Sequence, residues 1–165
     1  MSEYWDVYDK FRNRTNKTIQ RDSDERLKNG EYHIVVTGIV ENSNKQILIT
    51  RRNKNKKLYP GLWECTGGSA KAGESSIDAT IREIKEELNI DCEIDYLIDV
   101  WMYNILNKVN AFIVTYLCKN LEFNIDKIRI SNEHKEVGFF SIQDIDNLKM
   151  PNGYKNSIKK SLHGQ

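Results

Sequence analysis

Residues 68–90 read GSAKAGESSIDATIREIKEELNI. The second half of this stretch carries three carboxylates, Glu83, Glu86 and Glu87, at positions i, i+3 and i+4. A helix brings such positions onto one face, where like charges repel each other. A hard divalent cation held by oxygen ligands relieves that repulsion. A solvated acidic surface is the alternative interpretation, and the three acids alone do not decide between the two.

The residues around the acids predict where this helix begins and ends. Ser75 or Ser76 is suited to be the N-cap. Asn89 follows the last apolar residue, where a left-handed C-cap is expected. Before the helix, Gly67 and Gly68 suit a tight turn or a close approach of the backbone to a ligand. A second helix face, with apolar side chains that pack on a core, consists of Ile77, Ile81, Ile84 and Leu88.

This stretch resembles the Nudix box, whose pattern is G-x5-E-x7-R-E-U-x-E-E-x-G-U with U aliphatic. Asn89 departs from the pattern, because Gly is usual there, but both residues fit the same backbone role. The resemblance implies an α/β (α+β) fold: an α/β/α sandwich with a mixed central sheet, formed by a single domain over residues 1–165. The positions that match within the box, 68–90, are Gly68, Glu74, Arg82, Glu83, Ile84, Glu86, Glu87 and Ile90.

The family couples its box to the hydrolysis of a diphosphate joined to another group, X. In that reaction an activated water attacks one phosphorus, and the other phosphate leaves. A divalent cation neutralises charge on the diphosphate and acidifies the water. Mg²⁺ prefers carboxylates, carbonyls and water, so the resemblance implies Mg²⁺, with Mn²⁺ as a second possibility.

The resemblance also assigns roles to individual residues of the box. The expected metal ligands are Glu86, Glu87, the carbonyl of Gly67, and Glu83, which is either a ligand or the general base. Arg82 would orient a neighbouring carboxylate through a charge-assisted pair, while Glu74, with Gly68, would fix the loop. Bracing of the loop against the helix is the purely structural alternative for Arg82 and Glu74.

A further acid outside the box often completes sites of this family. Glu133 and Glu136 lie just before the apolar run that begins at Val137, where the family commonly places such an acid. Either could take a catalytic role. A charged surface loop is the alternative, and the sequence His134-Lys135 between them favours it.

Substrate contacts are expected from two further regions. The basic loop at 51–57 contains Arg51, Arg52 and Lys56, which could receive phosphates near an acidic metal site; simple solvation is the alternative. Trp101 and Tyr103 could stack on a base, although aromatic residues on a strand are more often part of the core.

Three further segments are Trp5-Asp-Val-Tyr8, Gly30-Glu-Tyr-His33 and Arg52-x3-Lys56-x3-Pro60-Gly61-x-Trp63. Together they resemble the branch of the family related to isopentenyl-diphosphate isomerase. Such an isomerase needs a catalytic Cys and a His at positions that are Gly67 and Ser69 here, while Cys65 is two residues away. His33 matches one metal-ligand position of the isomerase. Because the acids of the box are intact, we favour a hydrolase, and the resemblance to this branch suggests a nucleoside diphosphate derivative as its substrate. An isomerase, or a nucleotide-binding domain without catalysis, is the alternative.

The composition sets the remaining limits. With 25 basic and 24 acidic residues among 165, net charge predicts no bulk attraction to a nucleic-acid polymer or a membrane. Three scattered cysteines and no evident signal peptide predict reduced thiols and a cytoplasmic location. The expected partner is a small diphosphate compound, and a homodimer stays open. Alternating aromatic and acidic residues near the start predict an N-terminal hairpin over about 4–21.

Overall fold

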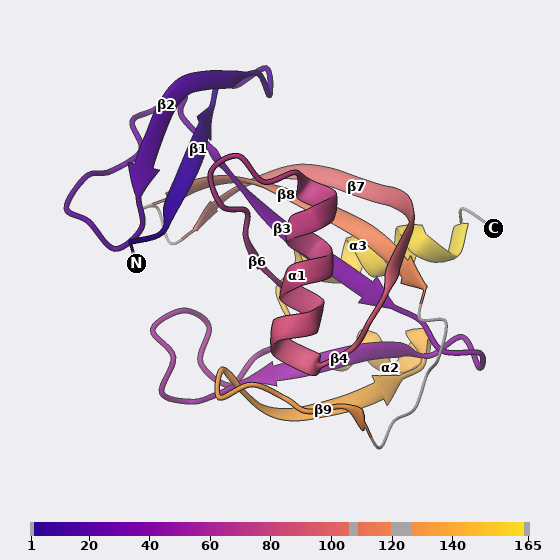
Figure 1. Ribbon diagram of the computed structural model, residues 1–165. Helices are drawn as coiled ribbons and strands as arrows, with labels where there is room; N and C mark the ends of the chain where they lie inside the picture. The colour runs from indigo at the N-terminus through magenta and orange to yellow at the C-terminus, as the bar shows by residue number, and fades with distance from the viewer. Residues whose placement is uncertain (1, 106–108, 120–126, 164–165) are drawn as a thin grey trace.

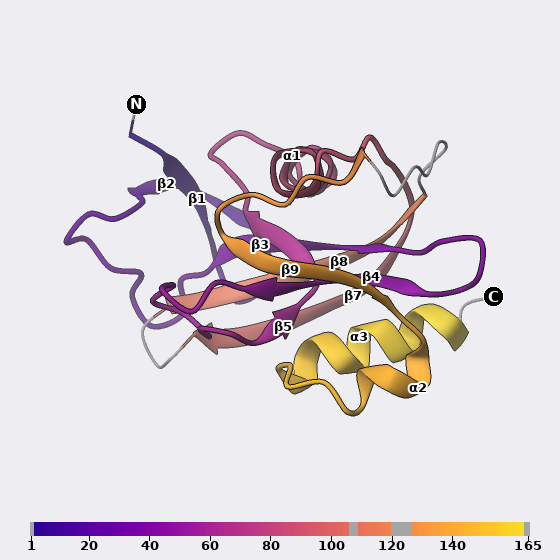
Figure 2. The ribbon, with the colours of Figure 1, turned by 90° about the horizontal axis from the view of Figure 1, so that it is seen from below.

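The computed structural model describes residues 2–105, 109–119 and 127–163. Its elements form three layers, with the sheets in the middle, α1 (Ser76–Leu88) on one side and α2 (Ile142–Ile145) and α3 (Asn152–His163) on the other (Figure 2). The expected α/β/α sandwich is therefore present. Among the described residues, no helix combines the length and the apolar character needed to cross a bilayer.

The middle layer differs from the single sheet that we expected, because it consists of two sheets. The first has the order β6 (Thr66–Ser69), β3 (His33–Val40), β8 (Val109–Lys119), β7 (Glu93–Ile105). It is mixed, since β3 and β8 run parallel while the other neighbours run antiparallel. The second has the order β5 (Trp63–Glu64), β4 (Ile47–Arg52), β9 (His134–Phe140), and all its pairs are antiparallel.

Apolar side chains fill both spaces between the layers. Ile84 and Leu88 of α1 are fully buried in a cluster with Leu48 and Val114 of the sheets. On the other side, Ile158 of α3 belongs to a second buried cluster that includes Ile39, Ile49 and Cys65. These two clusters fix α1 on the sheets, and with it the acids that it carries.

The ends of α1 follow the prediction. Ser75 is the N-cap, and its hydroxyl accepts a hydrogen bond from the Asp78 N–H at 3.1 Å. Asn89 is the C-cap in the left-handed conformation, with φ 57° and ψ 32°. Asn thus takes the backbone role for which Gly is usual in the box.

An N-terminal hairpin, predicted over about 4–21, is confirmed as β1 (Tyr4–Tyr8) and β2 (Arg14–Gln20). The hairpin forms a two-stranded sheet of its own and extends from the body of the molecule beside the loop that precedes α1 (Figure 1). Two backbone hydrogen bonds between Tyr8 and Tyr32, of 2.7 and 2.9 Å, connect it to the segment before β3.

Candidate metal and catalytic site

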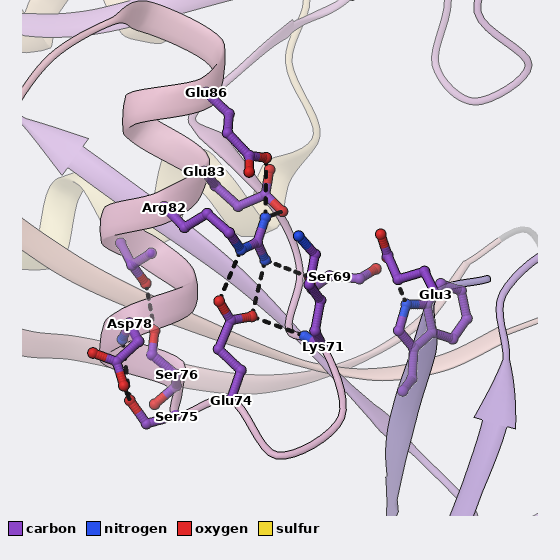
Figure 3. Close-up of polar contacts among 12 residues, drawn as sticks. Glu3, Ser69, Lys71, Glu74, Ser75, Ser76, Asp78, Arg82, Glu83 and Glu86 are labelled. Carbon is purple, nitrogen blue, oxygen red and sulfur yellow. Dashed lines mark hydrogen bonds and ion pairs between the residues drawn. The ribbon is translucent and has the colours of Figure 1, made fainter. Parts of the chain in front are cut away.

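Arg82 is the centre of the polar network on α1 (Figure 3). Its Nε and Nη2 donate to the two oxygens of Glu74, at 2.8 and 2.9 Å. Its Nη1 donates to Glu83 Oε1 at 2.7 Å and to Glu86 Oε2 at 3.2 Å, and Nη2 also reaches the Ser69 carbonyl at 3.2 Å. One guanidinium therefore joins the end of β6, the loop and two acids of the helix.

Glu74 is fixed from two sides. Besides its two bonds with Arg82, it accepts a hydrogen bond from the Lys71 N–H at 2.9 Å. Burial opposes ionisation of Glu74, but the bonds from Arg82 and Lys71 outweigh it, so its pKa lies below the ordinary value. The Glu74 carboxylate is therefore a stable anion that closes the loop on itself and orients Arg82.

Gly68 leaves the space that Glu83 occupies. A Cβ at this position would lie 2.5 to 2.7 Å from the Glu83 carboxyl atoms. Burial, with smaller contributions from Glu86 and Glu3, raises the pKa of Glu83 above its ordinary value, although Arg82 acts in the opposite direction. A carboxylate with a raised pKa is a better proton acceptor, which suits a general base.

Glu87 turns into the protein while Glu86 faces solvent. Glu87 is only 8% exposed, whereas 56% of the Glu86 side chain is exposed. Burial, followed by the charges of Glu64, Glu83 and Glu133, raises the pKa of Glu87 to about 9, and a hydrogen bond from the Gly67 backbone lowers it only in part. One buried oxygen of Glu87, Oε2, has no hydrogen-bond partner.

Glu64 organises a second network, which we did not predict and whose charge acts on Glu87. Glu64 Oε1 accepts hydrogen bonds from Arg52 Nη1 at 2.8 Å and from His134 Nε2 at 3.1 Å. Glu64 is only 9% exposed, and 70 residues separate it from His134. The one local signal was an acid between Trp63 and Cys65 in a short strand, where burial implies a partner.

The two acids predicted outside the box lie in different surroundings. Glu133 pairs with Lys56 at 3.0 Å, and its charge contributes to the raised pKa of Glu87. Burial works against ionisation of Glu133, but Lys56 outweighs it and holds its pKa below the ordinary value. Glu136 pairs instead with Arg51 at 3.2 Å, and about half of its side chain is exposed. The structure thus brings Glu133, rather than Glu136, towards the acids of α1.

The predicted phosphate-binding residues all have acidic partners in the protein itself. Arg51 pairs with Glu136, Arg52 with Glu64, and Lys56 with Glu133. Arg52 also donates from Nε to the Leu58 carbonyl at 2.8 Å. These cations therefore brace the loop after β4 against β5 and β9, and a phosphate would have to compete with those carboxylates.

Trp101 and Tyr103 lie away from the box. Both belong to β7, at the opposite edge of the four-stranded sheet from β6, which carries Gly67 and Gly68. They line an open pocket of about 510 Å³, and the Tyr103 hydroxyl hydrogen-bonds that of Tyr59. The other lining residues are Leu62, Lys149, Met150, Pro151, Asn152 and Gly153.

The donors at the site fit a hard divalent cation. In the described ranges, no group of three or more Asp, Glu, His or Cys side chains is already arranged to hold a metal ion. Arg82 accounts for this in part, because it engages both Glu83 and Glu86. The unpartnered Oε2 of Glu87 is the observation that favours a cation, since a buried carboxylate oxygen without a partner is costly.

Known proteins resemble this chain in sequence and in fold. The NUDIX domain model matches residues 31–161. An uncharacterized Nudix hydrolase of Listeria innocua is 40% identical over 93 residues, which are 56% of this chain and 54% of the relative. An isopentenyl-diphosphate Delta-isomerase of Shigella flexneri is 38% identical over 60 residues, 36% of this chain and 33% of that protein. The chain thus spans about half of the first of these relatives and a third of the second.

A solved structure extends the resemblance to the fold. The MutT protein from Methanosarcina mazei superimposes with a TM-score of 0.73 at 20% identity. The superposition covers 87% of this chain and 99% of the other. At this level of identity the similarity concerns the fold alone, and it confirms the sandwich with its mixed sheet.

Proposed function

The chain belongs to the NUDIX domain family, and from this premise we propose that it is a metal-dependent hydrolase of a diphosphate linkage in a nucleoside diphosphate derivative. One observation carries the proposal: Arg82 gathers Glu74, Glu83 and Glu86 beside a buried Glu87 that has an unpartnered oxygen. An acidic surface without function would expose its carboxylates to water. Burial of a carboxylate among other acids is instead typical of a site that gains a cation.

The proposed ligands of a Mg²⁺ ion are Glu86, Glu87 and the carbonyl of Gly67, with Glu83 either a further ligand or the general base. When bound, the ion supplies charge neutralisation on the diphosphate and acidifies water. Arg82 and Glu74 hold the carboxylates in place. Glu83 or Glu133 accepts the proton of the attacking water, as a bond forms between the water oxygen and phosphorus. The bond from phosphorus to the bridging oxygen breaks, and the second phosphate leaves with that oxygen.

We propose that the pocket beside Trp101 and Tyr103 receives the base of the substrate. Its aromatic walls offer stacking surfaces, and Lys149 adds a positive charge at its edge. Arg52 connects this pocket with the acidic site, because it donates both to the Leu58 carbonyl and to Glu64. Leu58 precedes Tyr59 of the pocket wall, so the two regions share one loop.

Two observations weigh against an isomerase. Cys65 is 2% exposed within a core cluster, and burial raises the pKa of its thiol. At the position where the isomerase would carry its cysteine, a Cβ on Gly67 would lie 2.0 Å from the Val36 carbonyl oxygen. A nucleophilic thiol thus has no place at either position, which favours hydrolysis.

Substitution of single acids tests the hydrolase. Glu87→Gln or Glu86→Gln should lower turnover of a nucleoside diphosphate derivative by roughly 100-fold or more, since each removes charge needed in the transition state. Glu93→Gln, on an exposed acid at the start of β7, is the matched control. The products, a nucleoside monophosphate and the phosphate of group X, are identified by chromatography, with Mg²⁺ and then with excess chelator. Full activity in chelator, or a normal Glu87→Gln enzyme, would refute the proposal.

Incubation with isopentenyl diphosphate and Mg²⁺ tests the alternative. We expect no dimethylallyl diphosphate, and we expect Cys65→Ala to keep the hydrolase rate within about threefold, as expected for a buried thiol outside the chemistry. Accumulation of dimethylallyl diphosphate at enzymatic rates, lost in Cys65→Ala, would establish the isomerase instead.

A further inference from the structure

The N-terminal hairpin lies outside the part of the chain that the family model matches. That match begins at residue 31, whereas β1 and β2 end at Tyr8 and Gln20. Membership of the family therefore assigns no role to the hairpin. Its position in the molecule nevertheless places it directly against the loop at 70–74 that leads into α1 (Figure 1).

Two hydrogen bonds attach this loop to β1. The Ala72 N–H donates to the Tyr4 carbonyl at 2.7 Å, and the Gly73 N–H donates to Asp6 Oδ2 at 2.8 Å. Gly73 has a φ of +82°, a conformation that side chains rarely adopt. Asp6 thus holds the loop at its most unusual backbone position.

Asp6 is itself held in place. Its Oδ2 pairs with Arg14 of β2 at 3.1 Å, and only 12% of its side chain is exposed. The hairpin is anchored to the main sheet by the stack of Trp5 on His33, whose ring centroids are 4.2 Å apart. His33 is 2% exposed and Trp5 is half-buried, so the stack packs the hairpin against a buried residue of β3. The hairpin is therefore a firm support for the loop.

A short chain of contacts leads from the loop to the acids. The N–H of Lys71, the residue before Ala72, donates to Glu74, and Glu74 receives two bonds from Arg82. Arg82 in turn binds Glu83 and Glu86 (Figure 3). Any displacement of the loop would move Glu74 and, through Arg82, the acids proposed to bind the metal.

We infer that the hairpin contributes to this site through Asp6, which is a positioning residue. Asp6 acts on Glu83 and Glu86 indirectly, through the loop at 70–74, Glu74 and Arg82. The inference rests on the proposed function for its kinetic consequence only. The attachment of the loop by Asp6 has a separate consequence, which is slow exchange of the Gly73 amide hydrogen.

Asp6→Ala is the decisive variant in the full chain. We expect kcat to fall roughly 10-fold with little change in KM, since a small misplacement of catalytic groups is costly. The Mg²⁺ concentration for half-saturation should rise roughly 10-fold, as for other residues that orient metal ligands. The Gly73 amide should exchange at least about 10-fold faster. Asp6→Asn keeps an acceptor oxygen, so its kcat, its Mg²⁺ requirement and its Gly73 exchange rate should lie close to those of the wild type.

Two further variants separate positioning from mere stability. Asp9→Ala removes the carboxylate that accepts the Phe11 and Asn13 amides in the hairpin turn, at 2.8 and 2.9 Å, without touching the loop. Arg14→Gln removes the ion pair that holds Asp6 but leaves the Gly73 bond, so it should lower kcat less than Asp6→Ala does. Asp9→Ala should keep kcat and the Mg²⁺ requirement close to those of the wild type. If Asp9→Ala lowers kcat as much as Asp6→Ala does, the inference is wrong.

Amide exchange at Gly73 still tests the role of Asp6 if the variant does not fold or if the wild type shows no hydrolase activity. If Asp6→Ala does not fold, rapid exchange of the Gly73 amide in the wild type would overturn the inference, and strong protection would support it. If the wild type hydrolyses no diphosphate, the proposed function fails. Exchange at Gly73 and the binding of Mg²⁺ alone, measured by calorimetry in wild type and Asp6→Ala, would still test the role of Asp6.

Discussion

Arg82 shows how one side chain can set the geometry of several others. Its planar guanidinium offers donors in fixed directions, which an ammonium group lacks. Arg82→Lys should therefore lower the free energy of unfolding by about 1–3 kcal/mol, because partly buried acceptors lose their donors, and lower kcat roughly 10- to 100-fold. Urea unfolding and steady-state kinetics measure both effects. Arg129→Lys, at an exposed position, should change neither, and equal behaviour of the two variants would contradict the role of Arg82.

Glu87 should make the stability of the metal-free protein depend on pH. Its pKa rises from the ordinary 4.5 to about 9 in the folded state, so the folded protein binds the proton more tightly than the unfolded chain does. The contribution of Glu87 to stability is therefore fully present below pH 4.5 and is lost as the pH rises towards 9. In chelator, Glu87→Gln should be more stable than the wild type at pH 9, by about 1–3 kcal/mol.

Thermal unfolding at pH 5, 7 and 9 measures this difference. The two proteins should have similar stabilities at pH 5 and diverge as the pH rises. Parallel curves over the whole range would mean that the Glu87 carboxyl ionises as it does in the unfolded chain.

At the scale of the element, two substitutions at the left-handed C-cap of α1 should differ in their effect on stability. Asn89 has a φ of 57° and is exposed. Both substitutions below remove the same 3.3 Å hydrogen bond from Asn89 Nδ2 to the Lys127 carbonyl, so the difference between them reports the backbone. Asn89→Gly should leave stability within about 0.5 kcal/mol. Asn89→Val should cost about 1–2 kcal/mol, because a β-branched residue is strained in this conformation. Urea unfolding of both variants provides the measurement, and equal stability of the two would contradict a left-handed cap.

Local elements were the part that the sequence predicted well. The caps of α1, the buried Ile84 and Leu88 on its apolar face and the hairpin follow from residues close together in the chain, where spacing and capping chemistry act directly. The prediction was wrong for Ile77, which is 44% exposed because it lies in the first turn of α1. Glu64 and His134 were missed because their contact joins residues 70 apart. The division of the middle layer into two sheets was missed for the same reason, since strand pairing is not encoded locally.

The basic loop illustrates the same limit in the candidate site. Charge alone pointed to phosphate binding at Arg51, Arg52 and Lys56, but each has a carboxylate partner from another element. The sequence held no sign of this pairing, because two of those acids lie on or next to β9, far along the chain. The roles of the box residues stay predictions, to be tested by the substitutions above.

At the scale of the whole molecule, Mg²⁺ should stabilise the fold. A ligand that binds only the folded state raises stability by about 2.7 kcal/mol at 100 times its dissociation constant. The gain should be larger at pH 8 than at pH 6, since the cation must displace a proton from Glu87. Melting temperatures with and without Mg²⁺ at both pH values test this.

Glu87→Gln supplies the control for that measurement. It should lose most of the increase in melting temperature that Mg²⁺ causes. An equal increase in this variant would mean that the ion binds elsewhere on the protein.

The parallel pairing of β3 with β8 has a consequence for how fast the molecule forms. Thr37 and Thr115 hydrogen-bond across these strands at 2.7 Å, although they are 78 positions apart in the sequence. Such a pairing closes a long loop before it gains contacts, which is typical of folding in milliseconds to seconds. We expect this pairing to be completed after the rate-limiting step, so the transition state should lack a formed cation site. Mg²⁺ would then slow unfolding and leave the folding rate almost unchanged. The bound ion would in that way increase the kinetic stability of the native state.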